Sequence, residues 1–438
     1  ADNFRKILDI ENRKGLYLEG RFFPNLKQIT EEIKQCNVEI REKKKDRVKN
    51  GAELNELREK REQLRKTKEE QLTNELQKVS NKVVARSFEI ELRKIDIPNN
   101  KPIYTVSATP EHFFAMKQIQ QNVSRLYDVK QANRAAIVNQ VKILLGDGFP
   151  KYVLRTDIDD FYESIPHEPI VKKINEDNLL TPFSKKLLMQ ILYQYKEKSE
   201  TDKGIPRGIG VSAYIAELYM RDIDKAIKEL HDVTFYSRYV DDIIIIFTPS
   251  HDHSRAYRND VSKILKKYKL TLNRSKTKPF DLRNGGKNFE LEYLGYEISF
   301  GKEEAKTRLT SKRVDKYKKR MDLAFDAYIN LSKVNEKKAR KLLVRRIRFL
   351  TGNTRLLNNK KNILVGIYYS NNQLTEQDDL ILLDEYLKGK IDTLISSSQL
   401  QKRLQKYSFQ EGYNKKRFSP FNIRELSEIM EVWGKRFP

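Results

Sequence analysis

Residues 234–247, TFYSRYVDDIIIIF, contain two adjacent carboxylates, Asp241 and Asp242, between two runs of β-branched and aromatic residues. Such runs predict strands, and the polar interruption between them predicts a hairpin turn. The continuous apolar run after the aspartates predicts a strand that is covered on both faces. Two like charges at the edge of a buried sheet are costly, and a bound divalent cation is the usual remedy. The alternative is an ordinary turn, because Asp is a common turn residue.

Residues 151–166, KYVLRTDIDDFYESIP, supply the other half of the predicted site. Residues 152–154 predict a strand, and Asp157 stands at its polar end. Alternation along a strand places Asp157 and Asp159 on one face and Ile158 on the other. We expect Asp157 to be the ligand, because the strand ends there and a site can open. We expect Asp159 and Asp160 not to be metal ligands, although their nearness to Asp157 suggests that role.

Three aspartates in this arrangement predict a two-metal centre. Two Mg²⁺ ions about 3.5–4 Å apart would clamp the attacking and leaving oxygens of an in-line displacement at phosphorus. Mg²⁺ takes hard oxygen ligands from few carboxylates and from substrate phosphates, which suits Asp157, Asp241 and Asp242 in a chain without clustered His or Cys. The predicted reaction is attack by a 3′-hydroxyl on the α-phosphate of a nucleotide, with pyrophosphate leaving.

The composition of the 438-residue chain narrows the class of partner. A formal net charge of +25 points to a polyanion, either nucleic acid or an anionic membrane surface. No apolar run approaches the roughly 20 residues that cross a bilayer, and no leader is visible, so we expect a cytoplasmic protein without a membrane partner. A single cysteine, Cys36, excludes an intrachain disulfide framework and a Cys-based zinc site.

Residues 25–84 differ from the rest in their dense charge and in apolar residues at spacings of three and four. This pattern predicts an antiparallel helical hairpin with a turn near residue 50. Mixed Glu and Lys on its faces indicate a solvated arm. The alternative is that this helical hairpin supports a bound RNA or a second subunit.

Basic residues gather in two further places. The segment SRLYDVKQANR carries Arg125, Lys130 and Arg134, which can grip a triphosphate or simply be solvated surface charges. From about residue 310 onward the chain is predicted to be helical and basic. The run KLLVRRIRFL there supplies three candidate nucleic-acid contacts, Arg345, Arg346 and Arg348. Residues 168–196 are also predicted to be helical, and residues 289–299 are predicted to form one strand.

The order and spacing of these segments resemble the palm motifs of reverse transcriptases over roughly residues 85–300. TDIDDFYESI resembles the first motif, which implies that Asp157 and the carbonyl of Ile158 bind metal and that Tyr162 is the aromatic sugar gate. Tyr239-Val240-Asp241-Asp242 is similar to the polymerase turn. GIPRGIGVS resembles the second motif, with Arg207 and Gly208 lining the nucleotide and template pocket. The family commonly has Gln at the position of Arg207, which either adds a phosphate contact or fills the pocket.

Three more segments extend the resemblance. LNRSKTK is similar to the following Lys-bearing motif, which implies that Lys276 lies near the leaving pyrophosphate. EYLGYEI resembles the primer grip, centred on Leu294, Gly295 and Tyr296. SRLYDVKQANR resembles the fingers segment, which implies that Arg125 holds the triphosphate.

The resemblance implies an α+β fold of the right-hand polymerase type, with an antiparallel palm sheet. The expected divisions are an N-terminal extension with the helical hairpin (1–84), fingers (85–150), a palm with a fingers insertion at about 168–200 (151–300), and a helical, basic thumb with a C-terminal tail (301–438).

The activity implied by the resemblance is RNA-directed DNA synthesis with two Mg²⁺ ions, for which Mn²⁺ can substitute. The expected partners are deoxynucleoside triphosphates, a DNA product and an RNA template or non-coding RNA, with a homo-oligomer or partner protein also open. With TGNTRL and GIYYSN in the expected thumb, the chain is most similar to bacterial phage-defence (abortive-infection-like) reverse transcriptases. The alternatives are a mobile-element or intron reverse transcriptase and a non-catalytic RNA-binding protein on a polymerase scaffold.

Overall fold

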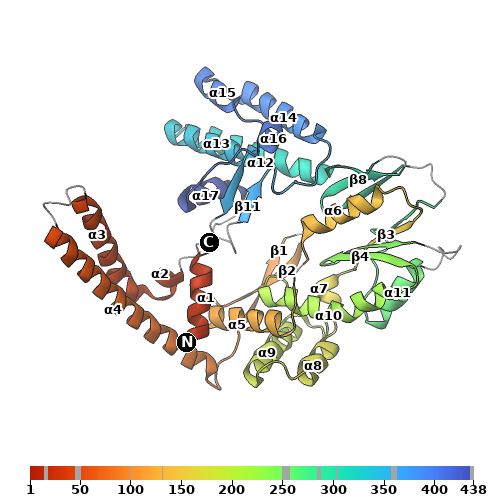
Figure 1. Cartoon of the computed structure of the whole chain (residues 1–438), viewed down its shortest axis with the longest axis horizontal. Helices are drawn as coiled ribbons and strands as arrows, with labels where there is room; N and C mark the ends of the chain where they lie inside the picture. Colours follow the sequence, from red (N-terminus) through yellow and green to blue (C-terminus); the bar gives the residue numbers. More distant parts are fainter. Residues whose placement is uncertain are drawn as a thin grey trace. The chain divides into compact units, whose positions relative to one another are not determined.

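The computed structural model describes residues 1–13, 18–44, 51–98, 100–130, 132–248, 257–283, 288–301, 304–356 and 363–434. Figure 1 shows the helices and strands of the chain. They belong to two compact units. The first comprises Ala1–Gln131, Asp159–Asp224 and Lys266–Leu270. The second comprises Ala132–Ile158, Lys225–Leu265 and Thr271–Pro438.

The first unit begins with a helical region in which the predicted hairpin is present. Its elements are α1 (Asp2–Arg13), α2 (Leu18–Phe22), η1 (Pro24–Leu26), α3 (Lys27–Lys43) and α4 (Gly51–Val84). Side-chain contacts of Asn37 with Arg61 and of Lys43 with Glu53 show that α3 and α4 run antiparallel. Apolar side chains at helical spacing, including Ile29, Cys36 and Ile40 of α3, are buried there. The predicted turn near residue 50 lies outside the described residues.

A short antiparallel hairpin and five helices complete this unit. They are β1 (Leu92–Ile97), β2 (Asn100–Val106), α5 (Pro110–Leu126), α7 (Phe161–Ser164), α8 (His167–Glu176), α9 (Pro182–Ser199) and most of α10 (Gly210–Lys228). The predicted helix at 168–196 is therefore two helices. Asn178 has a positive φ of 49°, and Thr181 caps a new helix whose first residue is Pro182.

The second unit contains the sheet predicted from the Asp-Asp segment. Its strand order is β4-β5-β3-β6, from β4 (Val233–Tyr239), β5 (Asp242–Phe247), β3 (Tyr152–Asp157) and β6 (Lys278–Asp281), and all neighbours are antiparallel. Ile244 and Ile246 pack in one core with helix α6 (Arg134–Leu145). Phe247 stacks on Tyr257 of helix α11 (Tyr257–Lys267), at a centroid separation of 4.0 Å. Both faces of β5 are thus covered, as its continuous apolar run predicts.

A second, three-stranded sheet corrects the prediction of one strand at 289–299. It consists of β7 (Phe289–Tyr293), β8 (Tyr296–Phe300) and β9 (Lys306–Leu309), in that order. Leu294 and Gly295 both have positive φ, 47° and 77°, and form a two-residue hairpin turn between β7 and β8. Positive φ at both central residues matches the twist of a β-hairpin, and Gly adopts it without strain.

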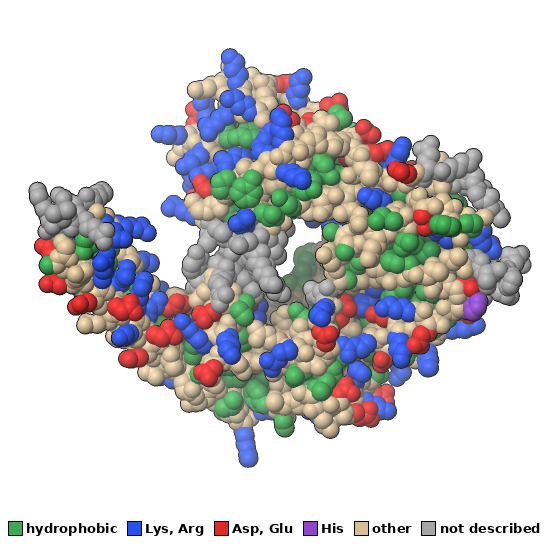
Figure 2. All heavy atoms as spheres, in the orientation of Figure 1, with side chains coloured by type: hydrophobic (Ala, Val, Ile, Leu, Met, Phe, Trp, Pro, Cys, Tyr) green, Lys and Arg blue, Asp and Glu red, His purple; other side chains and the backbone are tan. Residues whose placement is uncertain are grey.

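The C-terminal part of the second unit is mainly helical and has its own core. Its elements are α12 (Ser311–Ser332), α13 (Glu336–Thr351), β10 (Asn353–Leu356), β11 (Ile363–Gly366), α14 (Asp378–Leu394), α15 (Ser398–Leu404), α16 (Phe409–Asn414), α17 (Ile423–Met430) and η3 (Glu431–Trp433). Lys and Arg side chains gather over these helices on the face drawn in Figure 2. None of the helices in the described ranges has the length and apolar character needed to span a bilayer.

Candidate active site

Strand register brings the predicted acidic residues together at one end of the four-stranded sheet. Asp157, the last residue of β3, lies directly opposite Asp242, the first residue of β5. Asp241 occupies the turn between β4 and β5 beside Val240, whose φ is 61°. The N–H of Ile158 donates to the carbonyl oxygen of Asp241 at 3.2 Å, which ties the end of β3 to this turn. All of these residues belong to the second unit.

The carboxylates are crowded and poorly solvated. The Asp157 side chain is almost completely buried, with an exposed fraction of 6%. Burial and the nearby carboxylates of Asp157 and Asp242 raise the pKa of Asp241. Burial also raises the pKa of Asp242, against the opposing charge of Arg155. A site that penalises its own negative charges in this way favours the binding of cations.

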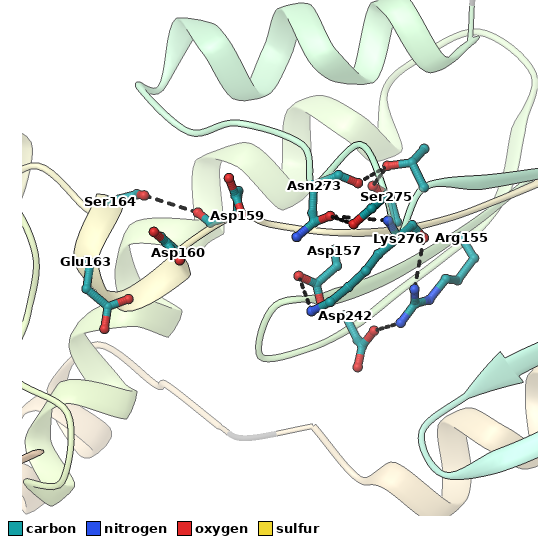
Figure 3. Close-up of polar contacts among 12 residues, drawn as sticks. Arg155, Asp157, Asp159, Asp160, Glu163, Ser164, Asp242, Asn273, Ser275 and Lys276 are labelled. Carbon is teal, nitrogen blue, oxygen red and sulfur yellow. Dashed lines mark hydrogen bonds and ion pairs between the residues drawn. The ribbon is translucent and has the colours of Figure 1, made fainter. Parts of the chain in front are cut away.

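Two cationic side chains of the protein lie against these acids (Figure 3). The Lys276 Nζ is 3.0 Å from the Asp157 carboxylate. The Arg155 Nη2 is 2.5 Å from Asp242 Oδ1, and its Nη1 donates to the carbonyl oxygen of Lys276 at 2.9 Å. The sequence pattern identified Lys276 but missed Arg155. Its position two residues before Asp157, on the same face of a strand, was the available signal.

The donor set fits a hard divalent cation. Within the described ranges, no three His, Cys, Asp or Glu side chains are already gathered as a metal cage. Asp157 and Asp242 instead pair with Lys276 and Arg155. The residues nevertheless supply carboxylate oxygens from adjoining strand ends. Burial, together with the neighbouring carboxylates, raises the pKa of Asp241. Few carboxylates combined with open positions for phosphate oxygens are typical of Mg²⁺ sites.

The two neighbouring aspartates lie differently from the three at the sheet. Strand β3 ends at Asp157, so the alternation expected to place Asp159 on the same face does not extend that far. Asp159 and Asp160 are both exposed and belong to the first unit. Asp160 precedes helix α7 with a φ of 44° and pairs with Lys101.

A second cluster, in the first unit, surrounds Tyr162. Arg207 forms a forked pair with Glu163, with Nη2 at 3.0 Å from Oε2, and its guanidinium lies 5.3 Å from the centre of the Tyr162 ring. Lys101 Nζ is 3.1 Å from Glu163. Although burial opposes it, hydrogen bonds from Arg207 and Lys101 lower the pKa of Glu163. Of the two roles considered for Arg207, the contacts favour packing at this cluster. Glu163 and Lys101 were missed, because their partners are distant in the chain.

Gly208 stands where two backbone segments nearly touch. Its φ is +100°, and a Cβ atom placed there would be 2.6 Å from the carbonyl oxygen of Tyr104 in β2. The N–H of Tyr104 in turn donates to the carbonyl oxygen of Arg207 at 2.6 Å. Gly208 therefore lets the segment after α9 pack against the β1–β2 hairpin, rather than only lining a pocket.

Residues 124–134, SRLYDVKQANR, which resemble a fingers segment, are divided between the two units. Arg125 is exposed and lines a cavity of about 670 Å³ formed by α1, α4, α5 and α9, whose described lining does not include Tyr162 or Arg207. Lys130 is exposed and pairs with Asp128 at 3.0 Å. The structure thus does not bring Arg125 to the Tyr162 cluster within the first unit.

Arg134 belongs to the second unit and contacts the predicted primer grip. It donates to the carbonyl oxygen of Leu294, with Nε at 2.8 Å, and its guanidinium lies 5.4 Å from the centre of the Tyr296 ring. Arg313 of α12 lies 5.3 Å from the same ring and donates to Gly295. Burial, followed by the charge of Arg313, lowers the pKa of Arg134.

A hollow of about 580 Å³ lies beside this turn and extends to Asp242. Its lining is strongly basic and includes Arg134, Arg155, Lys312, Arg313, Lys316 and Arg320. A concave surface of this charge next to a carboxylate site suits the phosphates of a nucleic acid strand.

The three arginines of α13 make contacts within the second unit. Arg346 is 5% exposed, so it cannot present its charge to a nucleic acid strand. Arg345 pairs with Glu425 and Glu428 of α17. Arg348 donates to Pro420 and lies 4.9 Å from the centre of the Phe421 ring, which leaves it partly buried.

Comparison with known proteins gives one family match. Residues 107–298 match the family model "Reverse transcriptase (RNA-dependent DNA polymerase)", and this range contains the aspartates, Tyr162, Arg207 and the predicted primer grip. No curated protein sequence matches the chain.

Two solved structures with similarity to the chain are telomerases. Apo telomerase from Candida tropicalis, truncated from the C-terminal domain, is 14% identical, with a TM-score of 0.37 over 52% of this chain and 56% of that one. Telomerase from Candida albicans, in complex with a TWJ fragment of telomeric RNA, is 12% identical, with a TM-score of 0.39 over 73% of this chain and 65% of that one. The chain thus spans 56% and 65% of these telomerase chains, less than two thirds of either.

The family match covers the part of the chain that holds both clusters described above. Residues 107–298 match a reverse transcriptase model, and the enzyme class that such a domain indicates is an RNA-directed DNA polymerase, a nucleotidyltransferase.

Proposed function

We propose that this chain extends DNA 3′ ends with deoxynucleotides copied from RNA, using Asp157, Asp241 and Asp242 as metal ligands. The observation that carries the proposal is the register of β3 and β5, which places Asp157 directly opposite Asp242 beside the Asp241 turn. The match of residues 107–298 to the reverse transcriptase model supports it independently.

The three aspartates and the carbonyl of Ile158 would hold two Mg²⁺ ions, or Mn²⁺ in their place. When bound, these ions polarise the α-phosphate and stabilise the charge that develops on the attacking and leaving oxygens. Lys276, which lies next to Asp157, would neutralise the departing pyrophosphate. Tyr162 acts as the sugar gate, with Arg207 packed on its ring. The basic hollow beside Gly295 receives the strand that carries the 3′-hydroxyl.

The direct test is incorporation of labelled deoxynucleotides by the purified chain with Mg²⁺, in parallel reactions with an RNA template and DNA primer, with a DNA template, and with no added nucleic acid. RNA-dependent extension of the primer is expected. Failure to incorporate any nucleotide with either Mg²⁺ or Mn²⁺ would remove the proposal.

We further propose that the enzyme works in bacterial defence against phage and uses a non-coding RNA as template or partner. The support is the similarity of its motifs, and of TGNTRL and GIYYSN in the C-terminal part, to those of phage-defence reverse transcriptases. Sequencing the nucleic acid that copurifies with the chain tests this. One dominant small RNA is expected, whereas intron or transposon RNA would favour a mobile-element enzyme.

Removing the aromatic ring at Tyr162 is expected to relax sugar selection. A Tyr162→Ala variant should use ribonucleotides at least about tenfold better relative to deoxyribonucleotides, because the ring no longer crowds a 2′-hydroxyl. The ratio of kcat/KM for the two nucleotide types measures the effect. Tyr193→Ala, which removes a tyrosine that is 64% exposed on α9, is the matched control. An unchanged ratio in Tyr162→Ala would make Tyr162 a packing residue only.

RNA affinity is expected to fall steeply with salt, because the chain carries a net charge of +25 and would contact phosphates. Each neutralised phosphate of a single strand contributes about 0.7 to the slope of log affinity against log salt. Replacing Lys312 and Lys316, which line the basic hollow, with Gln should therefore lower the slope by about 1.4. Replacing Lys172 and Lys225, which lie in exposed ion pairs, should change it little. Equal slopes in the two double variants would contradict binding in the hollow.

A further inference from the structure

The acidic cluster carries a cation of its own that the reverse transcriptase resemblance does not account for. Arg155 lies on β3 two residues before Asp157, so both side chains leave the same face of the strand. Its partner across the sheet, Ile244, is two residues after Asp242 on β5. Strand register therefore fixes the guanidinium next to Asp242.

The contacts of Arg155 hold it in one orientation. Nη2 bonds to Asp242 at 2.5 Å, and Nη1 bonds to the carbonyl oxygen of Lys276 at 2.9 Å. The side chain is only 15% exposed, and its Nε is buried without a hydrogen-bond partner among the described residues. A buried donor without a partner is destabilising. Fold stability alone therefore explains the presence of Arg at position 155 poorly. The contact of Arg155 with Asp242 explains it better.

Lys276 differs from Arg155 in a way that matters for function. Its side chain is 50% exposed and reaches Asp157 from a loop, at the end of a flexible four-carbon stem. It can leave Asp157 when a metal or a pyrophosphate arrives. Arg155 is tied to a strand and to a backbone carbonyl, so it stays beside Asp242 when other ligands bind.

We propose that Arg155 is a built-in counter-ion of Asp242 that weakens divalent-cation binding until a nucleotide arrives. This inference rests on the proposed metal site. A divalent cation held by Asp242 would be repelled by the positive charge of Arg155, because that guanidinium bonds to the same carboxylate in a poorly solvated place. The triphosphate of a nucleotide supplies the negative charge that offsets both. Binding of the metal therefore strengthens binding of the nucleotide, and the reverse also holds. Arg155 determines how large this coupling free energy is.

The experiment measures binding of Mn²⁺ to the full chain by electron paramagnetic resonance, without nucleic acid or nucleotide. Arg155→Gln is expected to bind Mn²⁺ on the order of tenfold more tightly than wild type, because the competing charge is gone. Arg155→Lys, which retains the charge, should stay within about threefold of wild type. Lys225→Gln removes a cation of the same unit that lies in an exposed ion pair with Glu229 and does not line the hollow, and should leave Mn²⁺ affinity unchanged.

A double-mutant cycle assigns the effect to Asp242. In an Asp242→Asn background, Arg155→Gln should no longer increase Mn²⁺ affinity. Persistence of the gain in that background, or an Arg155→Gln affinity equal to or weaker than that of wild type, overturns the inference. If wild type binds no Mn²⁺ that depends on Asp157 and Asp241, the proposed metal site itself fails, which is a separate outcome.

A measurement on the wild-type chain keeps the inference testable even where Arg155→Gln does not fold. The probe is a deoxynucleoside triphosphate analogue with a methylene group between the α- and β-phosphorus atoms, which cannot release pyrophosphate. Mn²⁺ affinity should rise at least about tenfold when the analogue is present. Arg155→Lys, which keeps the charge, should retain this gain, and Arg155→Gln should reduce it. Equal Mn²⁺ affinity with and without the analogue in wild type overturns the inference.

Discussion

An Asp241→Asn variant is expected to lose nucleotide incorporation by at least about 10³-fold, or roughly 4 kcal/mol of transition-state stabilisation. The neutral amide is a weaker ligand for a hard cation than a carboxylate, and it removes one of three charges from the proposed metal site. Primer extension with Mg²⁺ measures the loss. Substantial activity in the variant would contradict a role for Asp241 in metal binding.

Folding should survive the same substitution. Burial and the carboxylates of Asp157 and Asp242 raise the pKa of Asp241, which means that its charged form destabilises the folded state. At pH values above the raised pKa, removing the charge should leave thermal stability unchanged or slightly higher. Loss of activity without loss of stability therefore separates a ligand from a structural residue.

Asp159→Asn is the matched control, because Asp159 lies in the same motif as Asp157 but is exposed beyond the end of β3. It should retain activity within about threefold of wild type. A loss of activity as large as that of Asp241→Asn would contradict the prediction that Asp159 is not a metal ligand.

Local sequence patterns predicted the elements that carry the acids. The run Ile243–Phe247 predicted a doubly covered strand because its side chains alternate between two packed faces, and α6 and Tyr257 cover them. Asp157 was predicted at a strand end, and β3 ends there. Such features depend on residues that are neighbours in the chain, so periodicity reports them directly.

Contacts between distant segments were beyond the reach of such patterns. The basic run around Arg346 reads like a nucleic-acid surface, and only the fold shows that α17 brings Glu425 and Glu428 to Arg345. The Arg207–Glu163 pair was missed for the same reason. The alternation over residues 289–299 did not reveal the turn at Leu294 and Gly295. After a two-residue turn the second strand pairs with the first, and its side chains continue the same alternation between faces.

A Gly208→Ala variant is expected to be destabilised by about 2–4 kcal/mol, since two costs combine at one residue. Alanine is strained at the φ of +100° found there, and its Cβ would meet the Tyr104 carbonyl oxygen at 2.6 Å. Because that oxygen belongs to the backbone of β2, relief requires the β1–β2 hairpin to move. Movement would break the hydrogen bond from Tyr104 to the carbonyl of Arg207, whose side chain packs on Tyr162.

Urea unfolding and primer extension at a temperature below the transition together test this expectation. Stability should fall, and the folded fraction should also discriminate less well against ribonucleotides, because the Arg207 support of Tyr162 is displaced. Gly20→Ala in helix α2 of the same unit is the matched control, since a Cβ there meets nothing within 4 Å and alanine favours a helix by about 1 kcal/mol. If Gly208→Ala were as stable as Gly20→Ala, the close approach of β2 to residue 208 could not be a constraint on the folded chain. The coupling of the β1–β2 hairpin to Tyr162, the proposed sugar gate, would then have no structural basis.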